Sequence, residues 1–121
     1  MKNNEMLLRL ESLRKLLDRT DIVGYAAARN VRFLEEELVE FDEKRKALIQ
    51  KYGQEILDEN GNPTGRIELK AGTPQFEAFV AEIAPFGSIE HEPRIFKLGY
   101  GEAIGKLSGS ELLEFDWMFE D

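Results

Sequence analysis

Residues 99–106 have the residue types of a phosphate-binding loop, because glycines precede a Gly-Lys pair after a predicted strand. A phosphate loop needs four residues between its first glycine and the Gly-Lys pair, and then a serine or threonine that contacts magnesium. Here Gly101 is one residue too close, Gly99 is one residue too far, and Leu107 replaces the hydroxyl residue. We therefore interpret the segment as a flexible connector and expect no cofactor.

A second group of side chains resembles the start of a calcium loop. Asp58, Asn60 and Asn62 match its first three ligand positions. Pro63 then stands where glycine must turn the chain, and Leu69 stands where a bidentate glutamate is required. Because Asn-Gly is also the commonest tight-turn pair, we interpret the segment as the tip of a β-hairpin.

The only histidine, His91, lies between Glu90 and Glu92. Alternate residues of a strand point to opposite faces, so the imidazole would point away from both carboxylates. We expect a solvated strand end there and no metal site. No serine or lysine has a base partner at a recognisable spacing, so no catalytic residue is predicted and an enzyme is not expected.

The chain is acidic, with 16 basic and 24 acidic side chains and a formal net charge of −8. Residues 54–121 carry five of the basic and fourteen of the acidic side chains. An acidic surface repels phosphates, so nucleic acid is not an expected partner. There is no cysteine and no apolar run of signal-peptide or membrane-span length, so a cytoplasmic protein without a membrane segment is expected.

Two helices are the first elements that the sequence predicts. Leu10, Leu13 and Leu17, at spacings of three and four, lie on one face of a helix over residues 4–19. An uninterrupted helical pattern covers residues 21–52 and would span roughly 48 Å. A compact domain of this size is only about 35 Å across. We expect an antiparallel helical hairpin whose long second helix overhangs its globule or packs against another chain.

The pattern changes after the long helix. Turn residues 59–65 separate two short apolar segments, which predicts a β-hairpin. Thr73 and the proline after it begin a third helix, which Pro85 is expected to end. A strand over residues 92–98 is expected to join the hairpin. Ser108 begins a capping box and opens the last helix.

The predicted fold class is α+β: an N-terminal helical hairpin with one long helix, a small antiparallel β-sheet and two shorter helices. The chain is expected to form one domain over residues 1–121, with the helical hairpin in residues 1–53 and the mixed part in residues 54–121. The chain end carries Trp117 followed by methionine and phenylalanine. We interpret these large side chains as residues that close the core.

The apolar stripe of the long helix is the candidate contact surface. The first helix is half as long, so half of the stripe needs another cover. That cover is either the part formed by residues 54–121 or a separate protein, and the sequence leaves both open. The candidate interface residues are Leu34, Leu38, Phe41, Arg45 and Leu48.

Acidic side chains also gather on this helix, between Glu35 and Glu43. Such a run is usually a solvated helix face. The alternative is that it imitates DNA, together with the acidic residues 54–121, and binds a basic host protein by charge.

The order of the segments resembles a family. Residues 28–38 read Ala-Arg-Asn-Val-Arg-Phe-Leu-Glu-Glu-Glu-Leu, and an Asp-Glu-Asn-Gly hairpin and a short helix follow. The chain ends in Leu-Ser-Gly-Ser-Glu-Leu-Leu-Glu-Phe-Asp-Trp-Met-Phe-Glu-Asp. Over nearly its whole length the chain is similar to a family of short bacteriophage and prophage proteins of unknown function, although residues 99–105 are more glycine-rich. The resemblance implies a phage origin and a role in particle assembly or host interaction.

The expected function is therefore non-enzymatic protein interaction, as an assembly or accessory protein of phage or prophage origin. The partner is a foreign protein or a second copy in a homodimer. The alternative function is the acidic decoy.

Overall fold

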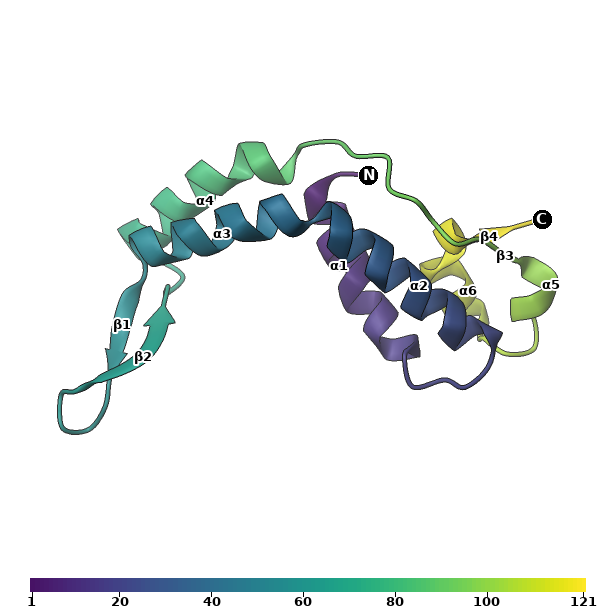
Figure 1. Cartoon of the computed structure of the whole chain (residues 1–121), viewed down its shortest axis with the longest axis horizontal. Coiled ribbons are helices and arrows are strands. Elements are labelled where there is room, and N and C mark those ends of the chain that lie inside the picture. The colour runs from purple at the N-terminus through teal and green to yellow at the C-terminus, as the bar shows by residue number, and fades with distance from the viewer.

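Two packed helices form the N-terminal part of the computed structural model, which describes all 121 residues. Helix α1 (Asn3–Leu13) continues into the short 3₁₀ helix η1 (Arg14–Leu16), and α2 (Ile22–Glu37) returns beside α1 (Figure 1). Asp21 caps α2, because its Oδ1 accepts a hydrogen bond from the Gly24 N–H at 3.2 Å. The predicted helical hairpin is confirmed, with a first helix that is shorter than expected.

The long helix is interrupted at Leu38. Helix α3 (Val39–Tyr52) follows α2 with only Leu38 between them, at φ −90° and ψ −2°. The helical segment ends where predicted, but the expectation of an uninterrupted helix is wrong. The residue has neither a proline nor a glycine beside it, so the periodic pattern gives no sign of the break. Its side chain is completely buried, so the bend lies at a residue that faces the protein interior.

Helix α4 (Pro74–Gly87) runs along α3, and the antiparallel strands β1 (Gln54–Leu57) and β2 (Pro63–Glu68) project from their common end (Figure 1). We call α3, β1, β2 and α4 together the arm. The predicted hairpin and small antiparallel sheet are confirmed. Thr73 caps α4 as expected, since its Oγ1 accepts from the Phe76 N–H at 3.2 Å.

The predicted end of α4 at Pro85 is wrong, because the helix includes this proline and ends at Gly87. Contacts from α1 hold the last turn: Asn3 Nδ2 donates to the Phe86 carbonyl oxygen at 2.8 Å, and the Asn4 side chain lies against Gly87. Pro85 has no N–H to donate to the carbonyl of Ala81, four residues earlier, and Ala81 is an exposed residue.

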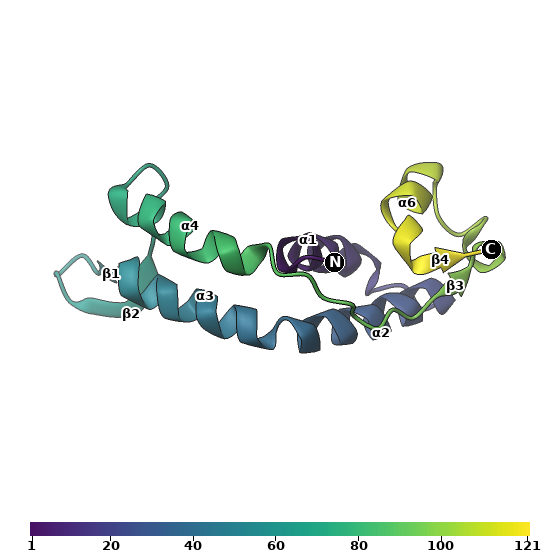
Figure 2. The ribbon, with the colours of Figure 1, turned by 90° about the horizontal axis from the view of Figure 1, so that it is seen from above.

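The strand predicted over residues 92–98 is also wrong, since this segment lies along α2 without joining the hairpin (Figure 2). The side chain of Asn30 in α2 forms two hydrogen bonds with the backbone of Phe96. Its Oδ1 accepts from the Phe96 N–H at 2.6 Å, and its Nδ2 donates to the Phe96 carbonyl at 3.1 Å. A backbone paired with a helix side chain cannot form a sheet ladder at the same residue.

The C-terminal elements follow this segment and pack against α1 and α2. Strand β3 (Leu98–Gly99) pairs in parallel with β4 (Phe119–Glu120), with α5 (Tyr100–Ala103), α6 (Gly109–Glu114) and the 3₁₀ helix η2 (Asp116–Met118) between them. The predicted capping box of Ser108 is confirmed. We call α1, α2 and these C-terminal elements the head.

The fold class is α+β, as predicted. Figures 1 and 2 show an arch in which the arm and the head lie at opposite ends of the bent α2–α3 segment. The main core consists of sixteen buried apolar residues, nearly all of them in the head. Met118 and Phe119 belong to this core, so the interpretation of the chain end as core closure is confirmed.

Candidate protein interface

The five residues predicted as an interface lie mostly inside the protein. Leu34 and Leu38 are completely buried, and Phe41 and Leu48 are buried as well. Arg45 is half-buried and pairs with Asp42 in the same helix, with 3.5 Å between Nη2 and Oδ1. The sequence left open whether this chain or another protein covers the stripe, and at these four apolar residues this chain covers it. Helical periodicity identified the inward face correctly, and α1 and α4 of the same chain cover it.

The arm nevertheless has very little interior. Between Val39 and Ile89, only Phe41, Leu48 and Gly87 are buried. Of these, Leu48 lies outside the main core cluster. No apolar side chain of α4, β1 or β2 is buried. Stable domains bury an apolar face between packed layers, and the arm has a single layer of two helices with a hairpin at its end. Its outer surfaces are therefore left without a cover.

One side of α4 is covered by α1 at the end of the helix and is uncovered along the rest. Gly87, Ala84, Val80 and Phe76 follow at helical spacings of three, four and four and so share one side of α4. At Gly87 this side touches Asn4 of α1. Beyond that contact nothing covers it, and the Val80 side chain is 44% exposed.

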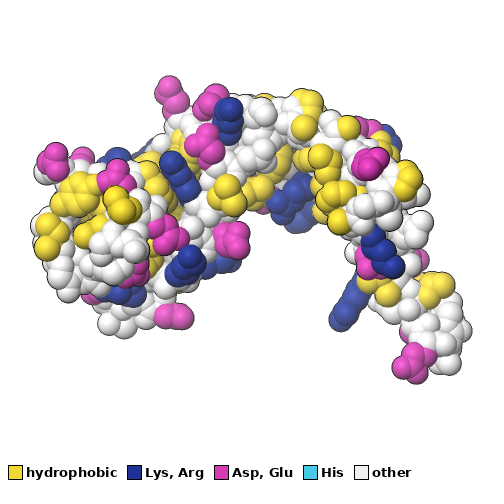
Figure 3. All heavy atoms as spheres, turned by 180° about the vertical axis from the view of Figure 1, so that it is seen from behind, with side chains coloured by type: hydrophobic (Ala, Val, Ile, Leu, Met, Phe, Trp, Pro, Cys, Tyr) yellow, Lys and Arg dark blue, Asp and Glu magenta, His cyan; other side chains and the backbone are white.

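The neighbouring helix α3 repeats this arrangement. Asp42, Arg45 and Ile49 share one side of α3, at spacings of three and four. The first two line a surface hollow together with Leu7 and Leu10 of α1. Ile49 lies one turn further along the same side and does not line this hollow. We call Ile49, Phe76, Val80 and Ala84 the arm face. Figure 3, drawn from behind, shows hydrophobic side chains along the arm with Lys and Arg beside them on the inner curve.

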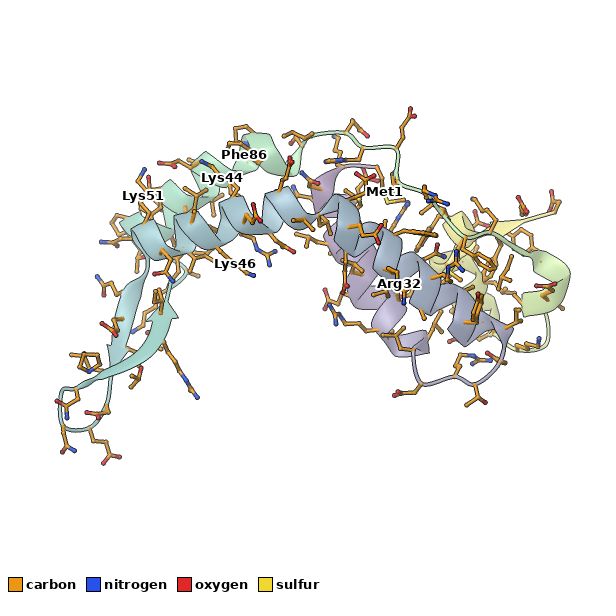
Figure 4. All side chains as sticks on the ribbon, in the orientation of Figure 1. Met1, Arg32, Lys44, Lys46, Lys51 and Phe86 are labelled. Carbon is orange, nitrogen blue, oxygen red and sulfur yellow. The ribbon has the colours of Figure 1, made fainter.

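A charged cluster fixes α4 on α3 next to this face. Glu82 of α4 accepts hydrogen bonds from the Tyr52 hydroxyl and from Lys51 Nζ, the latter at 2.9 Å. The hydrogen bond from Tyr52 and then that from Lys51 lower the pKa of Glu82 below its usual value of 4.5, and Glu82 raises the pKa of Lys51. Nearer the bend, Lys44 Nζ lies 5.0 Å from the ring centre of Phe86. Figure 4 shows Lys44 and Lys51 on the α4 side of α3 and Lys46 on the opposite side.

The β-hairpin adds a second uncovered surface to the arm. Its two strands pair only with each other, so both have a free edge that can accept another strand. Ile56 and Leu57 are 37% and 56% exposed. An isolated two-stranded hairpin is at best marginally stable in water, and here Ile67 at its base packs on Gly53.

Comparison of the chain with protein families, curated proteins and solved structures gave no match. Function is therefore inferred from the geometry of this chain. No helix of the structure combines the length and the apolar composition that crossing a membrane requires. No group of three or more His, Asp or Glu side chains converges in a way that could hold a metal ion.

Two amides of the glycine-rich segment, residues 99–106, and the amide of Leu107 bond to carbonyls of the segment itself. The N–H of Ile104 bonds to the Tyr100 carbonyl, and the N–H groups of Lys106 and Leu107 both bond to the Ala103 carbonyl. Amides that already have a partner are not free to surround a phosphate. The segment contains α5 and a turn at Gly105, so it is more ordered than the flexible connector that the sequence suggested.

The other two polar segments considered as binding sites, around Asp58 and around His91, form hydrogen bonds within the chain. Oδ1 of Asp58 accepts from the N–H groups of Asn60 and Asn62, each at 2.9 Å, which confirms the hairpin tip. Nδ1 of His91 lies 3.1 Å from Oε2 of Glu37 in α2. The sequence could not indicate this pairing, because the two residues are far apart along the chain.

The acidic run of the long helix is interleaved with cations. Arg29 and Arg94 lie over the ring of Phe33, at 5.4 and 5.1 Å from its centre. Glu36 and Glu37 line the same surface hollow as Arg94. The carboxylates therefore share their surface with arginines, whose positive charge reduces the negative electrostatic potential of this surface.

Sequence reasoning missed the arm face, although α4 carries a signal for it. Among the fourteen residues of α4 only Glu77 and Glu82 are charged, and apolar residues occur on every side of the helix. A helix that is apolar on all sides is normally buried on all sides. In this chain α4 is covered on one side only, so the composition indicates a missing neighbour.

Proposed function

We propose that this chain is a non-enzymatic protein that acts by binding another protein chain through its arm. The observation that carries the proposal is the arm face, a contiguous apolar surface on two mutually fixed helices that the chain itself leaves open. Exposed apolar patches of this kind on an ordered scaffold mark protein interaction sites.

The total surface area supports the proposal. The chain exposes 8034 Å². A compact monomer of 13.9 kDa exposes about 6,700 Å². The surplus of about 1,400 Å² is larger than the roughly 800 Å² that one partner contributes to a standard protein interface. An association that covers the arm would bring the exposed area to that of an ordinary folded protein.

The form of the surface favours a protein as the ligand. Small-molecule sites are concave and enclose most of the ligand, whereas the arm face is an extended strip along two helices. The net charge of −8 opposes the binding of nucleic acid. Apolar anchors on the faces of rigid helices are a recurring mode of protein recognition.

The setting that we propose rests only on the resemblance of the segment order to that of short phage and prophage proteins. In that setting the chain would act as an assembly or accessory protein, and its partner would be a component of the particle or of the host. The acidic decoy predicts a different salt response, since charge-driven binding weakens steeply with salt while apolar contact is nearly insensitive to it.

A photo-crosslinking amino acid in the arm tests the proposal. The probe would replace Val80 on the arm face, and in a matched control it would replace Leu113, an 82% exposed leucine of the head. In cells that express the chain, we expect discrete protein adducts from position 80 and none from position 113. Equal labelling from both positions, or no adduct from position 80, would contradict the proposal.

A further inference from the structure

We propose that the chain has a second contact surface, on α2, which binds an acidic segment of another protein through the carboxylates of that segment. The surface consists of two arginines and three aromatic residues from α2 and from the segment beside it: Tyr25, Arg29, Phe33, Arg94 and Phe96. We call these five residues the arginine patch. The inference goes beyond the proposed function, because the patch shares no residue with the arm face.

Helical spacing and one pair of hydrogen bonds bring the patch together. Tyr25, Arg29 and Phe33 follow one another at intervals of four residues, so they share one side of α2. The two hydrogen bonds from Asn30 hold Phe96 next to this side (Figure 2). The rings of Tyr25 and Phe96 then meet edge-on, with 5.7 Å between their centres. Two segments that are distant in the sequence thus form one surface.

Aromatic rings hold both guanidinium groups of the patch. The guanidinium carbon of Arg29 lies 5.4 Å from the centre of the Phe33 ring, 5.5 Å from that of Phe96 and 6.0 Å from that of Tyr25. The guanidinium carbon of Arg94 lies 5.1 Å from the centre of the same Phe33 ring. The two carbons are therefore at most about 10.5 Å apart, which is the sum of their distances from that centre. Contact with the rings orders the two cations before any ligand binds.

The N–H groups of these two arginines are largely unused within the chain. A guanidinium carries five N–H donors. Arg29 donates one hydrogen bond, from Nη1 to the Tyr25 hydroxyl at 3.2 Å, and neither arginine belongs to an ion pair. By contrast, Arg19 contacts both carboxylate oxygens of Asp21, at 3.2 and 2.7 Å. The patch therefore has the donors for such contacts and lacks the carboxylates.

The surroundings of the patch are basic although the chain as a whole is acidic. Residues 22–34 contain two arginines and no acidic residue, and residues 93–98 contain one arginine, one lysine and no acidic residue. Glu36 and Glu37 line a surface hollow together with Arg94, but neither forms an ion pair with it, and Glu37 pairs with the histidine instead. The patch thus presents positive charge that no carboxylate of the chain contacts.

These features specify the ligand by its chemistry. A planar guanidinium matches a carboxylate through two parallel N–H···O hydrogen bonds. Alternate residues of an extended segment share one face and lie about 7 Å apart, so two acidic side chains in this spacing can reach both guanidinium groups. Tyr25, which is 53% exposed, adds apolar contact area beside them. Arginine and tyrosine also dominate the binding energy of many protein interfaces. The occupant is therefore a protein segment with acidic residues in alternate positions.

The first experiment follows the Nε–Hε signals of the arginines by NMR during titration at constant ionic strength. The probe is a peptide of alternating glutamate and serine, and the matched probe has glutamine in place of glutamate. We expect saturable shifts at Arg29 and Arg94 with the glutamate peptide only, and none at Arg66, an exposed arginine of β2. The absence of saturable shifts, or equal shifts at Arg66, would overturn the inference. Tighter binding of an oligothymidine would also overturn it, since the ligand would then be a nucleic acid.

Substitutions of one exposed arginine test the geometry of the contact. Arg94→Gln should weaken binding of the glutamate peptide by about tenfold, because one charged hydrogen-bond donor group is lost. Arg94→Lys keeps the charge but cannot form two parallel bonds, so it should weaken binding by about threefold. The matched control Arg66→Gln should change the affinity by less than about twofold. Equal losses in Arg94→Gln and Arg66→Gln, or full affinity in Arg94→Lys, would overturn the inference.

The failure of this inference and the failure of the proposed function are distinguishable. The peptide titration reports on α2 and the segment beside it, whereas the photo-probe at position 80 reports on the arm. Adducts from position 80 without peptide binding would leave the proposed function standing and overturn the arginine patch. Peptide binding at Arg29 and Arg94 without adducts from position 80 would support the patch and contradict the role of the arm.

Discussion

Asn30, a completely buried side chain of α2, holds the backbone of Phe96 with two hydrogen bonds of 2.6 and 3.1 Å. An asparagine amide presents one acceptor and two donors, so it can satisfy the N–H and the carbonyl of one residue as a neighbouring strand would. The contact attaches the segment that links arm and head to the middle of α2. It also explains why that segment is extended without belonging to a sheet.

Removal of this amide should destabilise the head. Asn30→Ala leaves the partly buried N–H and carbonyl of Phe96 without partners, and an unpaired group that is buried costs about 1–3 kcal/mol. We expect the free energy of unfolding to fall by about 2–4 kcal/mol in chemical denaturation. Gln50→Ala, at an exposed residue of α3, serves as the control and should change stability by less than about 0.5 kcal/mol. Similar values for both variants would argue against a structural role of the amide.

Leu38 should behave as a core residue of the bend. Its side chain is completely buried, whereas that of its neighbour Val39 is 51% exposed. Leu38→Ala removes packed atoms and leaves a cavity, so we expect a loss of about 2–5 kcal/mol in the free energy of unfolding. Val39→Ala should cost less than about 1 kcal/mol. A Leu38→Ala variant that kept full stability would contradict its place in the core.

The attachment of α4 to α3 should depend on pH through Glu82. Tyr52 and Lys51 lower the pKa of this carboxyl in the folded protein, so folding favours its ionised form. The stabilisation is complete above the unfolded value of 4.5 and is lost as the pH falls through the lower folded value. Glu82→Gln should therefore be less stable than the original protein at pH 7, and the difference should shrink as the pH falls towards 3. Urea denaturation of both proteins across this range measures it. A constant difference would contradict the role of ionisation.

Two glycines should respond in opposite directions to alanine. Alanine within a helix usually stabilises a protein by about 0.4–1 kcal/mol relative to glycine. At Gly24 the added Cβ would overlap the backbone carbonyl of Arg19, so Gly24→Ala should lower the melting temperature. At Gly101 no heavy atom lies within 4 Å of the added Cβ, so Gly101→Ala should leave the melting temperature unchanged or raise it. Calorimetry of the two variants provides the comparison, and a stabilising Gly24→Ala would contradict the close approach at α2.

Local signals in the sequence predicted most of the elements. The caps at Thr73 and Ser108 and the turn residues around Asn60 act over a few residues, and the structure confirms the elements that they predict. The errors arose where a distant residue decides the local structure. The break at Leu38 depends on packing of the whole segment, and the missing strand depends on Asn30, which lies 66 residues before Phe96.

The candidate interface likewise has one part that local sequence signals predict and one part that depends on distant residues. Periodicity located the buried side of Leu34, Leu38, Phe41 and Leu48 correctly, but it cannot tell whether the cover belongs to the same chain. The arm face became visible only when the extents of α1 and α4 were known. Val80 lies in a helix that the sequence predicted, and its exposure follows from how far α1 reaches along the other side.

The bend at Leu38 makes the arm a lever. Helix α3 has fourteen residues, so its far end lies about 21 Å from the bend. A change of 10° at Leu38 would displace that end, and the hairpin with it, by roughly 4 Å. The span between the hairpin and the C-terminal elements thus depends on the φ and ψ angles of Leu38, together with the contacts of Asn3 and Asn4 with the end of α4. A partner that contacts both ends of the arch would therefore bind best at one value of the bend at Leu38.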